Sequence, residues 1–453
     1  MFATILAAAL AANSTCLKVE PATGDATARV QGAIDKVFKE GGGTVRVTRG
    51  EYRLGAIRLR SRVTLYLESG AKLIADRNID RYFILDNDAV EPVDPKLVTH
   101  EAWTLEQSCS EDNFTRYPAS RWNNGFIRLF RAEDASIIGE KGSLIDCMNP
   151  FDPIGEEFYR GPHGVSAIEC RNLVLRGYTI QNTGNWAHRI ADTKGLTVEN
   201  LTVLAGHDAV HINGCDDVRI ADCVFKTGDD CVAGFDNERV VVENCYLNTA
   251  CSGFRFAGYD VLIRNCTLKG PAEYGFRGSL SKADKAAGAP SGKAPRNNML
   301  SFFTNYSDGT HPVRRNAGKI RIVDCTSDDT DRFLHYNYGN ERWQMGKPMT
   351  DITFERVKAT RLKMPFASWG DAVVPIAMTF RDCTFGFSVK PAELIRGGFV
   401  GQILMENVGI EGADGVPLFR NWSKVVPKVQ CEKVQGVDLG VQQGTGTYKV
   451  RAI

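Results

Sequence analysis

The sequence lacks an excess of charge of either sign. Its 453 residues include 55 Lys and Arg and 54 Asp and Glu, which gives a formal net charge of +1. A protein that neutralises a polyanion with its whole surface is clearly basic, and a disordered chain combines few apolar residues with high net charge. With 43% hydrophobic residues, the chain fits neither class. We expect a folded protein without a nucleic-acid partner.

Prolines are few, and long apolar runs are missing. Only 17 prolines accompany the 44 glycines, which excludes a Gly/Pro-rich linker and assigns the glycines to turns. No apolar run is long enough for an integral membrane span. Residues 2–12 resemble the core of a signal peptide without its basic n-region. We therefore expect residues 1–16 to be a signal peptide and the protein to be secreted or periplasmic.

The 13 cysteines match no disulfide or zinc framework. Their number is odd, and no two of them form a C-x-x-C pair. Five lie within apolar runs, which is typical of small buried side chains: Cys223, Cys245, Cys266, Cys325 and Cys383. We expect neither a metal nor a cofactor.

What the sequence does contain is a repeat. Short segments that alternate apolar and polar residues end in Asn or Asp at Asn200, Asp222, Asn244 and Asn265, at intervals of 22, 22 and 21 residues. Earlier and later copies, such as residues 173–177 and 320–324, extend the series with less regular spacing. No amphipathic helical stretch separates the copies. The pattern predicts β-strands that recur once every 21 to 23 residues.

A β-only period of this length favours an all-β fold, a right-handed single-stranded parallel β-helix, in which coils stack about 4.8 Å apart. Leucine-rich repeats share the length but need a Leu and Asn pattern that is absent. An exposed end of such a stack needs a cap. Residues 28–39 place Val30, Ile34 and Val37 at helical spacing. We expect them to form a capping helix on a single β-helix domain over residues 17–453.

Two stretches interrupt the repeat. Residues 86–124 and 281–317 carry turn residues, aromatics and charges without strand alternation. Loops of this length are usually functional or disordered. The second stretch is also basic, which leaves open either a solvated loop or the wall of a cleft that meets an anionic or hydroxyl-rich ligand.

Because equivalent positions of successive coils stack, the repeat predicts which side chains are neighbours. The segments that start at Asn185, His207, Asp229, Cys251 and Glu273 align at intervals of 22 residues. Below them the next column reads Trp186, Asp208, Asp230, Ser252 and Tyr274, and a third reads Arg189, His211, Ala233, Arg255 and Arg277. An apolar column, Val210, Val232, Phe254 and Phe276, is expected in the core.

The first two of these three columns bring three carboxylates together. Asp208 stacked on Asp230 is unfavourable unless a proton, a cation or a positioned water lies between them. Together with Asp229, they suit the acid and base steps of glycosidic cleavage. A Ca²⁺ site is the alternative use of clustered carboxylates.

The sequence resembles the polygalacturonase-like glycoside hydrolases of family 28, which belong to the pectate-lyase-like β-helix superfamily. The resemblance covers most of the chain: residues 207–210 resemble the Asn-Thr-Asp-Gly segment of that family, and Thr227-Gly-Asp-Asp-Cys231 matches its Gly-Asp-Asp motif. It implies an inverting hydrolase in which Asp229 is the general acid, while Asp208 and Asp230 activate water.

Two family motifs are altered. The Gly-His-Gly motif falls at Cys251-Ser252-Gly253, and the Arg-Ile-Lys motif at Arg277-Gly278-Ser279, so a His and a Lys are missing. The resemblance implies that these cations hold a galacturonate carboxylate. The sequence offers replacement charge at other positions, and the expected substrate-binding residues are Arg255, Arg277, His207, His211, Ser252 and Tyr274.

These observations predict a glycosidase that cleaves a pectin-like, uronate-containing polysaccharide or oligosaccharide. The two long insertions favour an exo or short-substrate mode. The alternatives are a polysaccharide lyase on the same fold and a non-catalytic carbohydrate-binding β-helix. The sequence does not specify an oligomeric state.

Overall fold

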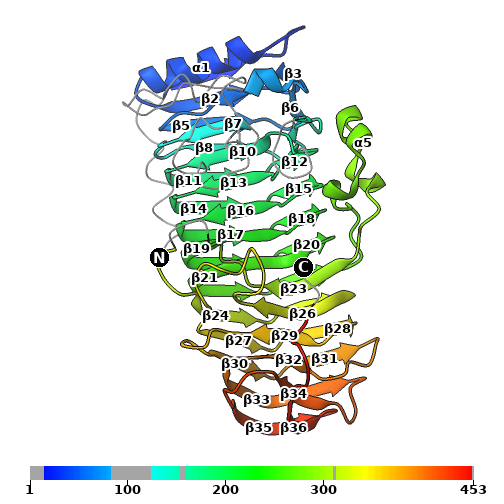
Figure 1. The fold of residues 1–453 in the computed structure, drawn as a ribbon. Helices are drawn as coiled ribbons and strands as arrows, with labels where there is room; N and C mark the ends of the chain where they lie inside the picture. Colours follow the sequence, from blue (N-terminus) through cyan, green and yellow to red (C-terminus); the bar gives the residue numbers. More distant parts are fainter. Residues whose placement is uncertain (1–14, 83–123, 154–159, 310–312, 451–453) are drawn as a thin grey trace.

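The computed structural model describes residues 15–82, 124–153, 160–309 and 313–450. Over these residues the chain is a right-handed parallel β-helix, as predicted, with coils stacked along one axis (Figure 1). Each coil consists of strands and bends, so the leucine-rich-repeat alternative is wrong. Residues 1–14 and 83–123, which hold most of the predicted signal peptide and of the first predicted insertion, lie outside the described residues.

The strands form three parallel sheets. The first contains β1 (Thr15–Val19), β2 (Gly43–Val47), β5 (Val63–Leu67), β8 (Ser136–Gly139), β11 (Arg171–Arg176), β14 (Lys194–Glu199), β17 (Asp216–Ala221), β19 (Val232–Glu243), β21 (Ser252–Arg264), β24 (Gly318–Val323), β27 (Asp351–Glu355), β30 (Ile376–Arg381), β33 (Val400–Glu411) and β35 (Lys428–Gln435). The second contains β3 (Gly50–Leu54), β6 (Ala71–Ala75), β9 (Leu144–Asp146), β12 (Thr179–Gln181), β15 (Thr202–Ala205), β18 (Val224–Thr227), β20 (Tyr246–Thr249), β22 (Thr267–Lys269), β25 (Thr326–Asp328), β28 (Lys358–Leu362) and β31 (Thr384–Phe387). The third contains β4 (Ile57–Arg58), β7 (Gly125–Phe130), β10 (His163–Ile168), β13 (His188–Ala191), β16 (Val210–Asn213), the first parts of β19 and β21, β23 (Met299–Thr304), β26 (Thr330–Asn337), β29 (Phe366–Trp369), β32 (Ile395–Gly398), β34 (Pro417–Asn421) and β36 (Asp438–Gln443).

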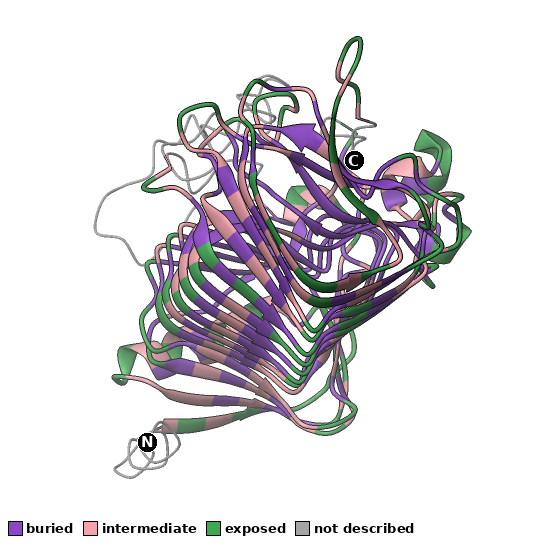
Figure 2. Cartoon of the chain, turned by 90° about the horizontal axis from the view of Figure 1, so that it is seen from below, coloured by how far each residue is buried: buried purple, intermediate pink, exposed green. Residues whose placement is uncertain are grey.

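The core lies inside the coils. Viewed along the stack, buried positions recur at the same place on successive strands (Figure 2). Val210, Val232 and Phe254 are fully buried and directly paired, so the predicted apolar column is correct over these coils. All five cysteines predicted to be buried are buried and free. Apolar side chains that stack on identical positions of the next coil supply most of the stabilisation of such a repeat.

The predicted capping helix is α1 (Thr27–Lys39), which covers the first coil at the top of Figure 1. Val30, Ile34 and Val37 are fully buried on one helical face. The helix packs against β1, β2, β4 and β5. It therefore closes the open end of the core, as the helical spacing predicted.

The Asn or Asp that ends each repeat lies at the bend between the first and second sheets. Asn200, Asp222, Asn244 and Asn265 all have left-handed backbone conformations, with φ between 53° and 56°. Asn and Asp tolerate this region better than other side chains with a Cβ. Their side chains also pair across coils: Asn244 Nδ2 donates to Asp222 Oδ1 over 3.0 Å, and Asn265 Nδ2 donates to Asn244 Oδ1 over 3.3 Å. Backbone conformation and this ladder together explain the repeat.

The substitution Asn244→Ala is expected to destabilise the protein by about 1 kcal/mol, because Ala is strained at positive φ and breaks the exposed ladder. Asn244→Gly, which relieves the strain but also lacks the amide, is expected to lose less. Urea unfolding of the three proteins measures both effects. A midpoint for Asn244→Ala equal to that of the wild type would contradict this explanation of the repeat.

The prediction of an unbroken loop over residues 281–317 is wrong in part. The segment contains α5 (Lys282–Ala287), the short 3₁₀ turn η6 (Ser291–Lys293) and strand β23 of the third sheet. β23 pairs with β21 and β26 and is therefore a regular part of a coil. Alternation was missed because residues 299–304 are almost all buried. The excursion that precedes β23 projects at the right of Figure 1.

Candidate active site

The register of the third sheet confirms most of the predicted columns. His188 pairs with Val210, and Val210 with Val232, so the offset is the predicted 22 residues. On the outer side of these strands, the column reads Arg189, His211, Ala233 and Arg255. The sequence repeat therefore places these side chains correctly beside one another.

The predicted column fails at its last member. Arg255 pairs with Thr304 of β23, so the segment that contains Tyr274 and Arg277 is not the next coil. Arg277 begins the 3₁₀ turn η5 (Arg277–Ser279), and its guanidinium donates to the carbonyl oxygens of Ala289 and Lys285. Arg277 thus holds the excursion together. Tyr274 is half-buried near Lys226, outside the stacked carboxylates.

Asp208 and Asp230 stack as predicted, with backbone amides between them. The backbone N–H of Asp230 donates to Asp208 Oδ1 over 3.2 Å, and the backbone N–H of Ser252 donates to Asp230 Oδ1 over 2.9 Å. Each carboxylate therefore accepts from the next coil. The Ser252 hydroxyl is buried and contacts Thr304 Oγ1 at 3.4 Å. Ser252 contributes to the site through its backbone.

Asp229 is held by a residue that the sequence repeat did not reveal. Arg160 Nη2 lies 3.1 Å from Asp229 Oδ2, and Nη1 of the same guanidinium donates to Asn185 Oδ1 over 3.2 Å. Both members of the ion pair are buried. Arg160 lies between β9 and β10 and belongs to no column, so spacing gave no signal for it.

Rings and an imidazole lie beside the carboxylates. His211 Nδ1 is 2.7 Å from Asp208 Oδ2. The His211 ring stacks on Trp186, with ring centres 3.6 Å apart and planes within 8°. The ring of Tyr306 meets the His211 ring edge-on at 5.7 Å. Trp186 was visible in the predicted column, whereas Tyr306 follows β23 and was missed.

Two predicted substrate-binding residues, Arg255 and His207, differ in charge. Arg255 Nη1 lies 3.8 Å from Asp230 Oδ2, and its guanidinium sits over the Tyr306 ring at 5.3 Å. His207 is buried, and burial, reinforced by Arg160 and Arg277, holds its pKa well below the usual value. His207 is therefore a neutral donor or acceptor. Arg255 carries the positive charge next to Asp230.

Burial controls the protonation of the stacked carboxylates. Desolvation, followed by the charges of Asp229 and Asp230, raises the pKa of Asp208 well above its usual value. Desolvation and then Asp229 raise the pKa of Asp230 to about 6, against the opposing charge of Arg255. Burial likewise holds the pKa of His211 well below its usual value. The raised pKa values favour retention of a proton by this pair, which is one of the conditions predicted for stacking Asp208 on Asp230.

A raised carboxyl pKa makes the fold less stable as pH rises. The folded state binds a proton that the unfolded state has released, so the contribution of Asp230 is present below pH 4 and lost as pH passes about 6. Thermal unfolding of wild type and Asp230→Asn between pH 4 and 8 isolates this group. We expect the wild type to lose more stability than the variant over this interval. Parallel pH profiles would contradict the raised pKa.

The insertion packs beside the site on one edge of the third sheet. Gly206 and Gly228 immediately precede His207 and Asp229. A Cβ at Gly228 would lie 2.1 Å from the carbonyl oxygen of Gly275, and one at Gly206 would lie 2.6 Å from Arg277 Cβ. Glycine at these positions therefore allows the excursion to lie directly against the bends that carry the carboxylates.

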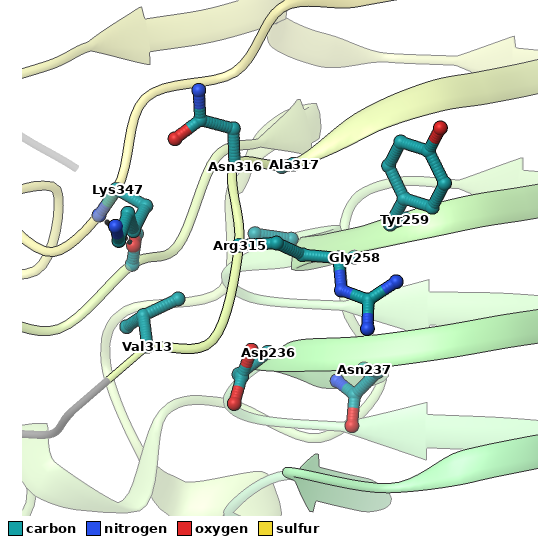
Figure 3. Close-up of a pocket in the computed structure, with 11 residues that line it drawn as sticks. Asp236, Asn237, Gly258, Tyr259, Val313, Arg315, Asn316, Ala317 and Lys347 are labelled. Carbon is teal, nitrogen blue, oxygen red and sulfur yellow. Dashed lines mark hydrogen bonds between the residues drawn. The ribbon is translucent and has the colours of Figure 1, made fainter.

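Residues 313–317 pack against the opposite edge of the third sheet, where β19 and β21 bend towards the first sheet (Figure 3). Arg314 pairs with Asp216 and Asp236. Arg315 pairs with Glu238 and lies over the Tyr259 ring at 5.7 Å. The cavity beneath them has a volume of about 10 Å³, enough for roughly one water. The ion pairs therefore attach residues 313–317 to the bends of β17 and β19.

A metal fits the cluster poorly. Within the described residues, the group with ligand atoms close enough to hold an ion is Asp229, Asp230 and Cys251, whose atoms lie within 4.8 Å of one another. Ca²⁺ takes six to eight oxygen ligands, and a buried thiol is not one of them. Burial also raises the pKa of Cys251 well above its usual value, which opposes a thiolate ligand. The donor set does not support the Ca²⁺ alternative.

Among the described helices, none has the length and apolar character needed to cross a membrane.

Comparison with known proteins finds similarity to right-handed β-helix proteins. A family model described as a right-handed beta helix region matches residues 163–283. A probable polygalacturonase of Vitis vinifera is 23% identical over 205 residues, which cover 44% of this chain and 38% of that protein. The chain spans between 21% and 43% of the lengths of the curated relatives it matches.

Solved structures share the fold over nearly the whole chain. An exopolygalacturonase of Thermotoga maritima has a TM-score of 0.60 at 14% identity and covers 87% of this chain and 92% of its own. A polygalacturonase of Erwinia carotovora has a TM-score of 0.57 at 14% identity, covering 92% and 96%. At such identities the likeness establishes the architecture. The chain therefore shares the right-handed parallel β-helix fold of these proteins.

Proposed function

We propose that the protein is a glycosidase that hydrolyses a uronate-containing, pectin-like glycan. The observation that carries this proposal is the group of three buried carboxylates, Asp208, Asp229 and Asp230, on adjacent coils of the third sheet. Three like charges are expensive to bury together and serve no core-packing purpose. Raised pKa values, such as those of Asp208 and Asp230, are typical of acid and base catalysis. The polygalacturonase-like fold supports the same assignment.

In the proposed mechanism, Asp229 protonates the glycosidic oxygen as the aglycone leaves. Asp208 and Asp230 position a water, and whichever of the two is ionised takes a proton from it while the water oxygen bonds to the anomeric carbon. Arg160 aligns Asp229, and His211 holds Asp208. Arg255, beside Asp230, neutralises charge on the substrate or on the site.

The stereochemical outcome needs a direct test. A carboxylate oxygen of Asp229 lies within 4.8 Å of one of Asp230, whereas the acid and base of inverting enzymes are typically about 6.5–9.5 Å apart. The proposed inversion therefore rests on the family resemblance. Proton NMR of the first-formed anomer distinguishes inversion from retention.

The proposed substrate is acidic because guanidinium groups lie next to the carboxylates. Arg255 and Arg160 both reach the cluster, and Arg255 Nε is buried with no partner among the described residues. A uronate carboxylate is the sugar group that a guanidinium recognises most strongly. The absence of the family Lys at position 279 and His at position 252 leaves Arg255 as the proposed substitute.

Reducing-sugar release from pectic fragments and from matched neutral glycans tests the proposal. We expect release from galacturonate-containing fragments and little from the neutral set. Binding without release across both sets would favour a carbohydrate-binding β-helix instead. Export remains a prediction, and assay of culture medium against cell extract tests it.

A further inference from the structure

The face of the third sheet that carries the carboxylates continues past them towards the last coils. Ser252 pairs with Ser301, and Ser301 pairs with Arg332. Arg332 therefore lies in the column of Asp208 and Asp230, three coils beyond Asp230, or about 14 Å along the stack. A sugar chain laid along this face from the carboxylates would reach Arg332.

Arg332 belongs to a second polar group on that face. Its Nη1 is 2.5 Å from His335 Nδ1, and His335 Nε2 is 2.7 Å from Glu341 Oε1. Asn337 Nδ2 also donates to Glu341 Oε1 over 2.7 Å. Arg332 and His335 are buried. These hydrogen bonds hold the side chains of the group in fixed positions.

What lies beside this group is the chain itself. After β36, residues 444–450 run back along the stack towards β26 (Figure 1). Gly444 N–H donates to the Asn421 carbonyl, Trp422 Nε1 to the Thr445 carbonyl, and Arg396 Nη1 to the Lys449 carbonyl. Residues 444–450 are therefore anchored on β32, β34 and the bend that follows β34.

Tyr448 fills the space between the anchors. Its ring stacks on Trp369 at 4.3 Å and meets Trp422 at 5.6 Å. Its hydroxyl is buried near Arg332 and Glu341, and has no hydrogen-bond partner within the described part of the chain. Burying a hydroxyl without a hydrogen-bond partner costs free energy, so packing of the Tyr448 ring against the two tryptophans holds the residue in place.

We propose that residues 444–450, through Tyr448, form a stop that ends the sugar-binding face on the side of the last coils. An acidic oligosaccharide bound across Asp208 and Asp230 then has its terminal sugar against Tyr448 and Arg332, and a longer chain cannot continue in that direction. This inference rests on the proposed function. Residues 444–450 would then limit the length of the bound substrate.

The test is the dependence of affinity on chain length, measured by calorimetry with oligogalacturonides of increasing size and with polygalacturonate. Asp229→Asn serves as the non-hydrolysing background. Its affinity is expected to stop rising once the oligosaccharide reaches Tyr448. In Asp229→Asn/Tyr448→Ala, long chains are expected to bind about tenfold more tightly, a change of about 1.4 kcal/mol, while the shortest bind as before.

Tyr448→Phe is the matched control. It is expected to show the same length dependence of binding as the protein with Tyr448, because ring stacking is retained. Trp422→Leu removes one anchor of residues 444–450 and is expected to change the length dependence of binding as Tyr448→Ala does. It keeps the proposal testable if Tyr448→Ala does not fold. Binding with the same dependence on chain length in all variants would overturn the stop alone. Failure of every oligogalacturonide to bind would overturn the proposed function and the stop together.

Discussion

Asp229→Asn is expected to lower kcat on an accepted glycan by at least about 10³-fold while leaving the fold intact. The substitution keeps the volume of the side chain and an oxygen to accept from Arg160, but it removes the proton that the leaving oxygen needs. Initial rates of reducing-end release measure the loss. Circular dichroism and thermal unfolding verify that the coils remain.

Asp222→Asn provides the matched control for this variant. Asp222 lies on the neighbouring bend of the chain, is exposed, and has a φ of 56° that Asn also tolerates. The same chemical change there is expected to leave kcat unchanged. Near-normal activity of Asp229→Asn would contradict the assignment of Asp229 as the acid.

Arg160→Met is expected to have the second largest effect, on both stability and activity. Arg160 and Asp229 form a buried ion pair, and removing one partner of a buried pair typically costs about 3–5 kcal/mol. The guanidinium also positions the Asp229 carboxylate, so kcat is expected to fall as well. Urea unfolding and initial rates of reducing-end release measure the two losses.

Arg160→Lys is the matched control, because it keeps the positive charge. We expect Arg160→Lys to lose less stability and less activity than Arg160→Met. Stability and activity of Arg160→Met equal to those of the wild type would contradict the role of Arg160 in holding Asp229.

The repeat allowed the fold and the stacked carboxylates to be predicted because both depend on spacing. Twenty-two residues per coil places Asp230 next to Asp208, and Arg255 in the column of His211, whatever the details of the bends. The structure adds the reason for the terminal Asn or Asp, a left-handed bend that such residues tolerate.

The site residues that the sequence did not predict depend on where the chain leaves the coil. Gly275-Phe276-Arg277 imitates Gly253-Phe254-Arg255 in sequence, yet the true partner of Phe254 is Phe303, because an excursion with its own helix intervenes. Arg160 and Tyr448 approach the third sheet from outside the repeat. Periodicity carries no information about such residues, since their positions are set by tertiary contacts.

Hydrolysis of oligogalacturonate in ¹⁸O-labelled water tests the central claim most directly. We expect new reducing ends that each carry one ¹⁸O, and no unsaturated product by ultraviolet absorbance. In Asp229→Asn, neither new reducing ends nor incorporated ¹⁸O are expected. Unsaturated, unlabelled ends would identify a lyase. Tight binding of the same oligosaccharide without any new ends would contradict a catalytic role for the three carboxylates.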